Sequence, residues 1–271
     1  MSKFYDCRND DLQDLILDEA ARTIERGELI VLPTDTVYGV GADAFSADAV
    51  AALLSAKGRG RDMPPPVLIP RVETLDGLAS DVPDAGRRLA TEFWPGALTI
   101  ICQAQPSLDW DLGDTHGTVA IRMPADDTAL AILRRTGPLA VSSANKTGKP
   151  AAATADEARD QLGESVQLYL ESGASGSAAP STIVDATVTP LRVVRQGAIT
   201  LDALRVVVPE LLDVDGNPAR AVAEPDAAPS DTAAAAEDQD DTTALFDEVV
   251  PDSDPPLADD AELDNDGNER A

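Results

Sequence analysis

The sequence predicts an α/β domain, a twisted mixed sheet with flanking helices, followed by an acidic tail. Segments with helical spacing alternate with short apolar runs, and several strand-like segments follow one another late in the domain. A chain of 271 residues with 43% hydrophobic content can bury a substantial core. The domain is expected to span residues 1–208 and the low-complexity tail residues 209–271.

Helices are predicted where apolar residues recur at three- and four-residue spacing. In the first of these segments, Leu12 to Ile24, the following Gly27 is a typical stop signal. Thr200 is a typical N-cap residue for a last short helix. The helices are expected at 12–24, 47–56, 84–93, 127–135, 155–162 and directly after Thr200.

Strands are predicted at short apolar runs between turn-forming residues. Because the last three follow one another with little helix between them, the sheet is expected to be mixed rather than purely parallel. The strands are expected at 29–32, 67–69, 98–102, 118–123, 139–142, 167–170, 182–185 and 192–195.

Charge is distributed unevenly along the chain. From Pro218 to the end there are 17 acidic residues, 2 arginines and only one aromatic residue, Phe246. Such a segment cannot bury enough apolar surface to offset its ordering entropy, so we predict that it is disordered. The remaining residues still carry −13 of the net charge of −28, which argues against a protein whose main task is binding nucleic acid.

The chain also lacks the marks of a secreted or membrane protein. Cys7 and Cys102 are too few for a disulfide scaffold, and no CxxC pair suggests a metal site. The N-terminus has no apolar run typical of a signal peptide, and no segment approaches the ~20 apolar residues that span a membrane. We therefore expect a cytoplasmic protein without membrane contact.

Two polar segments follow predicted elements in the first third of the chain. Residues 33–41, PTDTVYGVG, combine hydroxyls, a carboxylate and glycines after a buried strand, although a capped turn would explain them equally well. Residues 57–62, KGRGRD, place three cations in a glycine-loosened loop. Arginine and lysine in such a cluster suit polyphosphate, but an isolated charge run is more often a solvated surface.

Two further segments extend this set. Arg122 lies in an otherwise apolar strand, where it needs either an anionic ligand or a structural acid. Residues 142–148, SSANKTG, run from a strand into a loop rich in hydroxyl and amide groups. Ser181 and Arg195, from two later strands, complete the candidates.

The residues that are missing constrain the chemistry. His116 is the only histidine, and no GxSxG motif supplies a serine nucleophile. Covalent catalysis and histidine acid–base catalysis are therefore not expected. A site of cations, hydroxyls and amides suits reactions in which positioning and neutralisation of phosphate charge provide the acceleration.

Seven segments, taken in order, resemble the landmarks of the threonylcarbamoyl-AMP synthase family, and the resemblance as a whole covers roughly residues 10 to 205. Each is weakly specific alone, but their order makes chance resemblance very improbable. The segments are LPTDTVYGVGADAF, AKGRGRDMP, FWPGALT, GTVAIRMP, VSSANKTGKPA, STIVD and LRVVRQGAIT.

The resemblance implies a YrdC-like fold, with a twisted sheet around a basic cavity. It also implies a nucleotidyltransferase that converts L-threonine, bicarbonate and ATP into threonylcarbamoyl-AMP and pyrophosphate. The product would serve threonylcarbamoyladenosine modification of tRNAs that read ANN codons, through the tRNA threonylcarbamoyl transferase machinery and with tRNA bound indirectly. Mg²⁺ would accompany ATP, and no protein metal ligands are expected.

Site residues follow from the resemblance position by position. Lys57 and Arg59 are expected to be catalytic and to bind ATP. The other expected ATP contacts are Thr118, Ser143, Asn145 and Arg195, and the expected threonine contacts are Thr36, Arg122 and Ser181.

The chain departs from the family pattern in two loops. Residues 63–68 read MPPPVL where many members read NPLIVH, so Met63 and Leu68 replace an asparagine and a histidine. Ala151 begins an alanine run in place of a stretch containing Ser or Thr. The contacts made by the usual residues at these positions are not expected here.

Two alternative functions remain compatible with the residues. One is a non-catalytic RNA-binding or ribosome-assembly factor that uses the same basic cavity. The other is a carbamoyl-adenylate enzyme that acts on carbamoyl phosphate, although such proteins usually carry extra domains.

Overall fold

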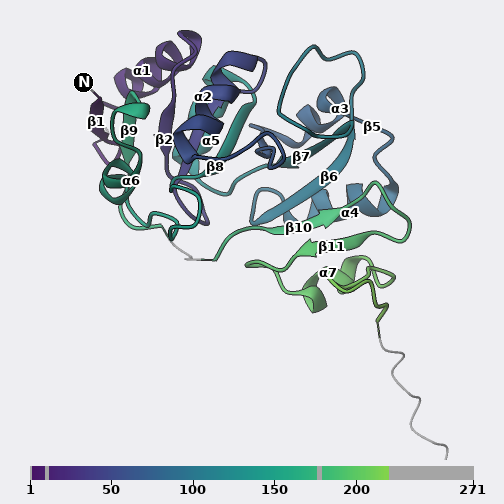
Figure 1. Ribbon diagram of the computed structural model, residues 1–271. Helices are drawn as coiled ribbons and strands as arrows, with labels where there is room; N and C mark the ends of the chain where they lie inside the picture. Colours follow the sequence, from purple (N-terminus) through teal and green to yellow (C-terminus); the bar gives the residue numbers. More distant parts are fainter. Residues whose placement is uncertain (1, 10–11, 176–178, 220–271) are drawn as a thin grey trace, which may run out of the picture. The chain divides into compact units, whose positions relative to one another are not determined.

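The computed structural model describes residues 2–9, 12–175 and 179–219, which all lie within one compact unit, Met1–Val222 (Figure 1). Helices and strands alternate through most of this unit. The α-helices are α1 (Gln13–Glu25), α2 (Ala47–Lys57), α3 (Leu75–Leu78), α4 (Asp84–Phe93), α5 (Asp127–Thr136), α6 (Ala155–Leu162) and α7 (Leu201–Val207). Short 3₁₀ helices occur at Val72–Thr74 and Gly163–Ser165.

The strands form a single mixed sheet, which confirms the predicted fold class. Its order is β1-β9-β2-β3-β8-β4-β7-β6-β10-β11, with β5 paired to β6 outside this path. The strands are β1 (Lys3–Asp6), β2 (Ile30–Leu32), β3 (Gly39–Asp43), β4 (Val67–Leu68), β5 (Ala79–Ser80), β6 (Leu98–Ala104), β7 (Thr118–Arg122), β8 (Leu139–Ser143), β9 (Leu168–Glu171), β10 (Thr182–Asp185) and β11 (Arg192–Arg195).

Parallel and antiparallel pairs are interspersed along the sheet. The parallel pairs are β1 with β9, β9 with β2, β4 with β7, and β6 with β10. The other pairs, including β3 with β8 and β10 with β11, are antiparallel. This mixture brings residues from distant parts of the sequence to neighbouring positions.

The sheet buries apolar side chains on both faces. Along β2, Ile30 and Leu32 join the cluster packed by α1 and α5, whereas Val31 joins the larger cluster that includes residues of α2, α4 and α6. Successive strand residues point to opposite faces, so an uninterrupted apolar run is what a strand covered on both sides requires. The helices α1 and α5 pack against each other on this side of the sheet.

Helix ends are defined by side-chain caps and one left-handed glycine. Ser46, Asp126, Thr154 and Thr200 each accept a hydrogen bond from the backbone N–H three residues on. At the other end of α2, Gly58 adopts φ 64°, a conformation that glycine reaches without steric cost. This turn ends the helix between Lys57 and Arg59.

The sequence predictions match most elements closely. The spans of α4, α6, β10 and β11 are those predicted, and Thr200 caps α7 as expected. Four elements were not predicted, namely β1, β3, α3 and β5. Of these, β3 is the stretch GVGAD, which begins inside the 33–41 segment that was interpreted as a site loop or a capped turn, and β5 and α3 are too short to show a period.

The described fold continues beyond Val208, where the sequence analysis placed the end of the domain. Leu211 is fully buried, and Leu212 forms a bridge to Arg192 of β11. The rest of the predicted tail, from residue 220, lies outside the described residues. None of the helices within 2–9, 12–175 and 179–219 is long and apolar enough to cross a membrane.

Gly197 tests how closely the segments around β10 and β11 pack. A Cβ atom at this position would meet the backbone of Pro180 and Ser181, which cannot move aside as a flexible side chain would. We expect Gly197→Ala to destabilise the fold by about 1–3 kcal/mol, measured by urea denaturation. Gly77→Ala is the control, because a Cβ atom there meets nothing within 4 Å. Equal stability of the two variants would contradict this packing.

Candidate active site

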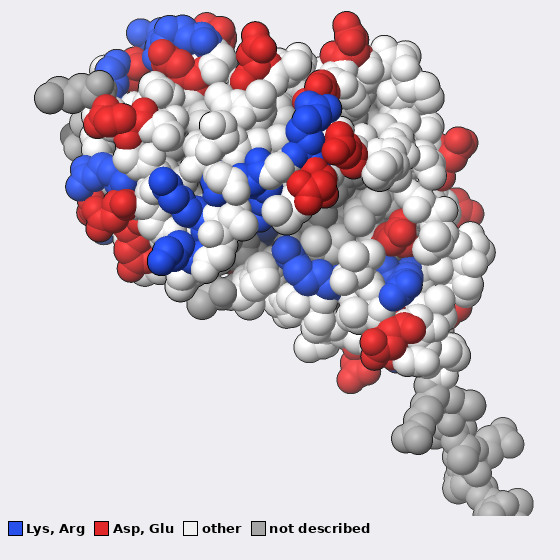
Figure 2. Space-filling view, viewed as in Figure 1, with Lys and Arg blue, Asp and Glu red and all other residues white. Residues whose placement is uncertain are grey.

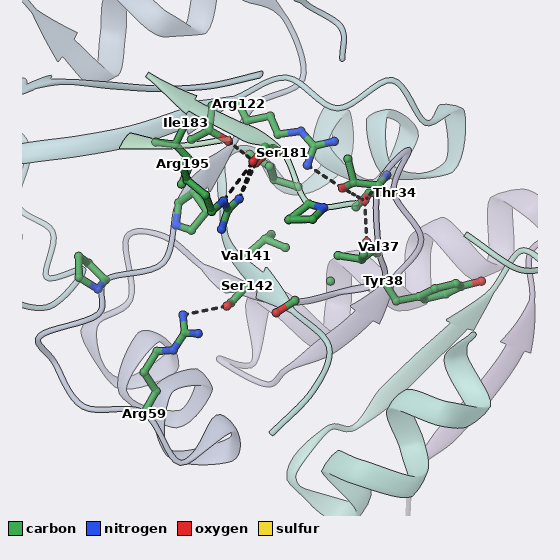
Figure 3. A pocket seen from close by; sticks show the side chains of 18 residues that line it. Thr34, Val37, Tyr38, Arg59, Arg122, Val141, Ser142, Ser181, Ile183 and Arg195 are labelled. Atoms are coloured by element: carbon green, nitrogen blue, oxygen red, sulfur yellow. Dashed lines mark hydrogen bonds between the residues drawn. The ribbon is translucent and has the colours of Figure 1, made fainter. Parts of the chain in front are cut away.

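A cavity of about 220 Å³ lies against the central strands of the sheet (Figure 3). Its walls come from the loop after β2, from the residue that follows the end of α2, and from β4, β6, β7, β8, β10 and β11. The lining residues are Thr34, Thr36, Val37, Tyr38, Gly39, Arg59, Pro64, Pro66, Leu68, Thr99, Arg122, Val141, Ser142, Ser143, Pro180, Ser181, Ile183 and Arg195.

Arg59 enters the cavity from the end of α2. Its Nη1 donates a hydrogen bond of 3.3 Å to the Ser142 hydroxyl, and its buried Nε has no hydrogen-bond partner among the described residues. No carboxylate within 2–9, 12–175 and 179–219 forms an ion pair with it. An unpaired buried N–H costs free energy, so a ligand that accepts a hydrogen bond from Arg59 Nε would remove that cost.

Arg195 reaches the cavity from the end of β11, on the side opposite Arg59 (Figure 3). Its Nη2 donates to the carbonyl and hydroxyl oxygens of Ser181 at 2.7 and 3.1 Å. The Ser181 hydroxyl in turn bonds to Thr99 at 2.8 Å. Partial desolvation and the positive charges of Arg122 and Arg59 lower the pKa of Arg195 from its ordinary value.

Arg122, at the end of β7, is almost fully buried, and each of its three guanidinium nitrogens donates a hydrogen bond. Its Nε donates to the Gly96 carbonyl at 2.9 Å, its Nη1 to the Thr36 hydroxyl at 2.9 Å, and its Nη2 to Asp35 at 2.6 Å. Burial lowers the pKa of Arg122, and the charge of Asp35 opposes that shift. Both sequence interpretations of Arg122 therefore hold, because it pairs with a structural acid and also lines the cavity.

The loop after β2 supplies hydroxyl groups. Thr34 donates to the Val37 carbonyl at 2.6 Å and lies 3.1 Å from the Thr36 hydroxyl, so each threonine fixes the other. Thr34, like Asp35, Thr99 and Ser142, was not among the predicted site residues. A sequence signal existed for Thr34 and Asp35, which belong to the PTDT segment, but not for Thr99, which reads as an ordinary strand residue.

Positive charge is concentrated at this cavity although the chain carries a net charge of −28. Figure 2 shows Lys and Arg residues bordering a hollow in the middle of this face. Elsewhere arginines form surface ion pairs, for example Arg61 with Asp111, Arg87 with Asp76, and Arg135 with Asp14. The local positive charge of the cavity thus attracts anionic groups of a ligand. The net negative charge of the whole chain repels anions at long range.

The structure brings six of the nine predicted site residues into the lining, namely Thr36, Arg59, Arg122, Ser143, Ser181 and Arg195. Thr118 lines an adjoining cavity of about 180 Å³, which shares Pro64, Pro66, Thr99 and Ile183 with the first. Lys57 and Asn145 are buried behind the wall formed by Ser142 and Ser143. Neither residue lines either cavity.

The departures from the family pattern have different surroundings. Leu68 lines the cavity, whereas Met63 is exposed and Ala151 lies on the surface. Of the three replaced residues Met63, Leu68 and Ala151, only Leu68 lines this cavity. Among the described residues, no group of three or more His, Cys, Asp or Glu side chains could hold a metal ion.

Comparison with known proteins identifies close relatives. The model of the Sua5/YciO/YrdC family, described as "Telomere recombination", matches residues 22–197. A Mycobacterium tuberculosis protein, provisionally named a threonylcarbamoyl-AMP synthase, is 49% identical over 79% of this chain and 97% of its own length. The threonylcarbamoyl-AMP synthase of Bacillus subtilis is 35% identical over 70% of this chain and 56% of its own length.

A solved structure supports the same relationship. The crystal structure of Pyrococcus abyssi Sua5 complexed with L-threonine matches with a TM-score of 0.73 and 30% identity. The match covers 79% of this chain and 62% of that one, so this chain spans less than two thirds of the archaeal protein.

The buried pair of Arg122 and Asp35 provides a stability test of the site. Removal of the carboxylate by Asp35→Ala leaves a buried guanidinium without its ion-pair partner, which we expect to cost about 3 kcal/mol. The measurement is the free energy of unfolding in denaturant. Asp111→Ala is the control, because the pair of Asp111 with Arg61 is exposed and its loss should change stability little. A similar effect of both variants would contradict the assigned role of Asp35.

Proposed function

Because the chain belongs to the Sua5/YciO/YrdC family, we propose that it is an L-threonylcarbamoyladenylate synthase. It joins L-threonine, bicarbonate and ATP into threonylcarbamoyl-AMP and pyrophosphate. The product is the activated intermediate for threonylcarbamoyladenosine in tRNA, and it passes to the transferase that modifies the tRNA. The tRNA itself is not a ligand of this cavity.

The observation that carries the proposal is the arrangement of three arginines around one cavity. Arg59 and Arg195 lack carboxylate partners among the described residues, and Arg122 keeps one side toward the cavity. Guanidinium groups recognise phosphate and carboxylate oxygens through paired N–H donors. A nucleoside triphosphate and an amino acid together supply both kinds of oxygen.

The end of the cavity near Arg122 suits the amino acid. Arg122 would bind the threonine carboxylate, while the hydroxyls of Thr36 and Ser181 lie near enough to hold the polar side of the substrate. Leu68 and Val141 supply an apolar wall there. The archaeal relative whose structure was solved with L-threonine supports this choice of amino acid.

The part of the cavity between Arg59 and Arg195, which we call the phosphate end, suits the triphosphate. Arg59 and Arg195 would neutralise phosphate oxygens, and the hydroxyl of Ser143 lines the same region. Mg²⁺ would enter with ATP, held by the phosphate oxygens, since no cluster of protein carboxylates is present within the described residues. Thr118, in the adjoining cavity, remains a candidate contact for the rest of the nucleotide.

The chemistry needs no protein nucleophile. The threonine amine adds to carbon dioxide, which is in equilibrium with bicarbonate, and loses a proton to form a carbamate. A carbamate oxygen then attacks the α-phosphorus of ATP, the bond to the β-phosphate breaks, and pyrophosphate leaves. Arg59 and Arg195 would stabilise the charge that develops on the phosphates, which is the main catalytic contribution such a site can make.

RNA binding as the sole function has less support. A site for an RNA backbone needs a basic surface, yet arginines outside the cavity form surface ion pairs with acids, as Arg87 does with Asp76. An enzyme acting on carbamoyl phosphate is a chemical alternative that the assay below separates.

The test is pyrophosphate release by the full chain with MgATP and bicarbonate, in the presence of L-threonine, L-serine, carbamoyl phosphate or no further substrate. We expect release that depends on L-threonine and bicarbonate. Release only with carbamoyl phosphate, or no release under any condition, would overturn the proposal.

Arg59→Ala and Arg195→Ala should each reduce kcat/KM for ATP by about a hundredfold, because each removes a charged donor from the phosphate end. The measurement is the initial rate of threonine-dependent pyrophosphate release. Val206→Ala is the control, because this side chain is 84% exposed and lies outside the cavity. Near-normal rates in both arginine variants would contradict the assignment of the phosphate end.

A further inference from the structure

Lys57 is a cation with almost no contact with solvent. The residue is 1% exposed, at the last position of α2, and its side chain points into the protein. Its Nζ donates to the carbonyl oxygens of Ser143 and Asn145, the latter at 2.7 Å, and lies 3.5 Å from Asn145 Oδ1. The observed partners of this ammonium therefore lie at the end of β8 and in the turn that follows it.

The backbone of Lys57 holds the same turn from a second point. The Thr147 N–H donates to the Lys57 carbonyl at 2.9 Å. Within the turn, the Asn145 side-chain amide donates to the carbonyls of Lys146 and Lys149 at 3.0 and 2.7 Å. One lysine thus connects the end of α2 to Ser143, Asn145 and Thr147.

The three cations of the KGRGR segment point in different directions. Gly58, in its left-handed conformation, reverses the chain so that Arg59 faces the cavity while Lys57 faces the turn. Arg61 faces outward and pairs with Asp111 and Asp114. The three cations therefore do not form one phosphate-binding cluster. Lys57 binds the turn, Arg59 lines the cavity, and Arg61 forms a surface ion pair.

We propose that Lys57 is a positioning residue, which binds no phosphate itself but holds the Ser143–Asn145 turn in the shape that binds the nucleotide. An ammonium group attracts carbonyl oxygens, so it draws those of Ser143 and Asn145 inward and keeps their negative ends away from the cavity. The Ser142 and Ser143 residues are left to line the wall, with the Ser142 hydroxyl fixing Arg59.

We call the contact of the Lys57 ammonium with the carbonyls of Ser143 and Asn145 the clamp. The burial of this charge makes the clamp sensitive to pH, and the pH dependence can be tested. Burial and the nearby charge of Arg59 lower the pKa of Lys57 to about 8. Arg59 is the charged group that acts on it, and Lys146 and Lys149 of the same turn are exposed to solvent. As the pH rises through 8, Lys57 loses its charge and the carbonyls lose their strongest donor.

Loss of the charge on Lys57 at high pH should weaken the clamp, but it should raise the free energy of unfolding. Because the folded-state pKa lies below the ordinary value of 10.5, the unfolded chain binds more protons than the folded chain between pH 8 and 10.5. This group therefore adds stability as the pH rises through that window. A weaker affinity for nucleotide at pH 9 would accordingly not reflect unfolding caused by Lys57.

Hydrogen exchange of the ligand-free protein tests the clamp directly. In Lys57→Met, which keeps most of the stem and removes the ammonium, we expect the amides of residues 145–149 to exchange at least tenfold faster than in the wild-type chain at the same pH. Arg59→Met is the matched control, because it removes the neighbouring cation of the cavity and should leave exchange in this turn unchanged. Unchanged exchange in Lys57→Met, together with weaker MgATP binding, would identify Lys57 as a phosphate contact and overturn the proposal.

A second measurement starts from the wild-type chain, whose pH dependence does not require that any variant folds. The Kd for MgATP, without threonine, should rise by up to about tenfold between pH 7 and pH 9, in step with loss of the charge on Lys57. Lys57→Arg, which stays charged, should flatten this dependence. A Kd that does not change with pH in the wild-type chain would contradict the clamp.

The assignment of MgATP as the ligand rests on the proposed function, whereas the exchange experiment does not. If the wild-type chain releases no pyrophosphate but the turn loosens in Lys57→Met, the proposed function fails and the clamp stands. If release depends on threonine but exchange of the turn is unchanged, the clamp fails and the proposed function stands.

Discussion

The structure is organised around three guanidinium groups brought together at one cavity of an acidic chain. Like charges repel, so Arg59, Arg122 and Arg195 can share this space only because their surroundings compensate them. Asp35 balances one of them, and neutral oxygens of Ser142 and Ser181 hold the other two without cancelling their charge. The cavity therefore keeps an attraction for anions that the rest of the chain, with its net charge of −28, does not have.

The sheet order makes this arrangement possible. Thr99, Ile183 and Arg195 occupy matching positions on β6, β10 and β11, although nearly a hundred residues of sequence separate the first from the last. Leu68 and Arg122 are paired in the same way on β4 and β7. Since burial of at least one face fixes the register of a strand, as Val193 does in β11 and the apolar residues do in β6, the core sets the positions of these cavity side chains.

Sequence patterns predicted the elements with strong periodicity and the residues with unusual chemistry. The apolar runs of β10 and β11 and the helical spacing of α4 were sufficient to locate these elements, and Arg122 stood out because it interrupts an apolar strand. The directions in which the side chains point could not be predicted from the sequence. Whether Lys57 faces the cavity or the turn depends on the left-handed conformation of Gly58 and on a turn almost ninety residues away.

The sequence also did not show which residues contribute to the site through a contact with another side chain. Thr99 reads as one more strand residue, and its contact with Ser181 arises only from the parallel pairing of β6 with β10. Asp35 lies within a segment that suggested a site, but its partner could not be assigned before the end of β7 was placed beside the loop after β2. The residue types of the site can thus be recognised within short segments of sequence. Their contacts depend on segments that are far apart in the sequence.

The most direct test of the central claim is detection of the product itself. The full chain would be incubated with MgATP, L-threonine and ¹³C-bicarbonate, and the adenylate formed would be identified by mass spectrometry before it decomposes. We expect an adduct of AMP and threonine that carries one labelled carbon, formed much more slowly when Arg59 is replaced by alanine. An adenylate without the label, or none formed from threonine and bicarbonate, would show that this cavity serves another reaction.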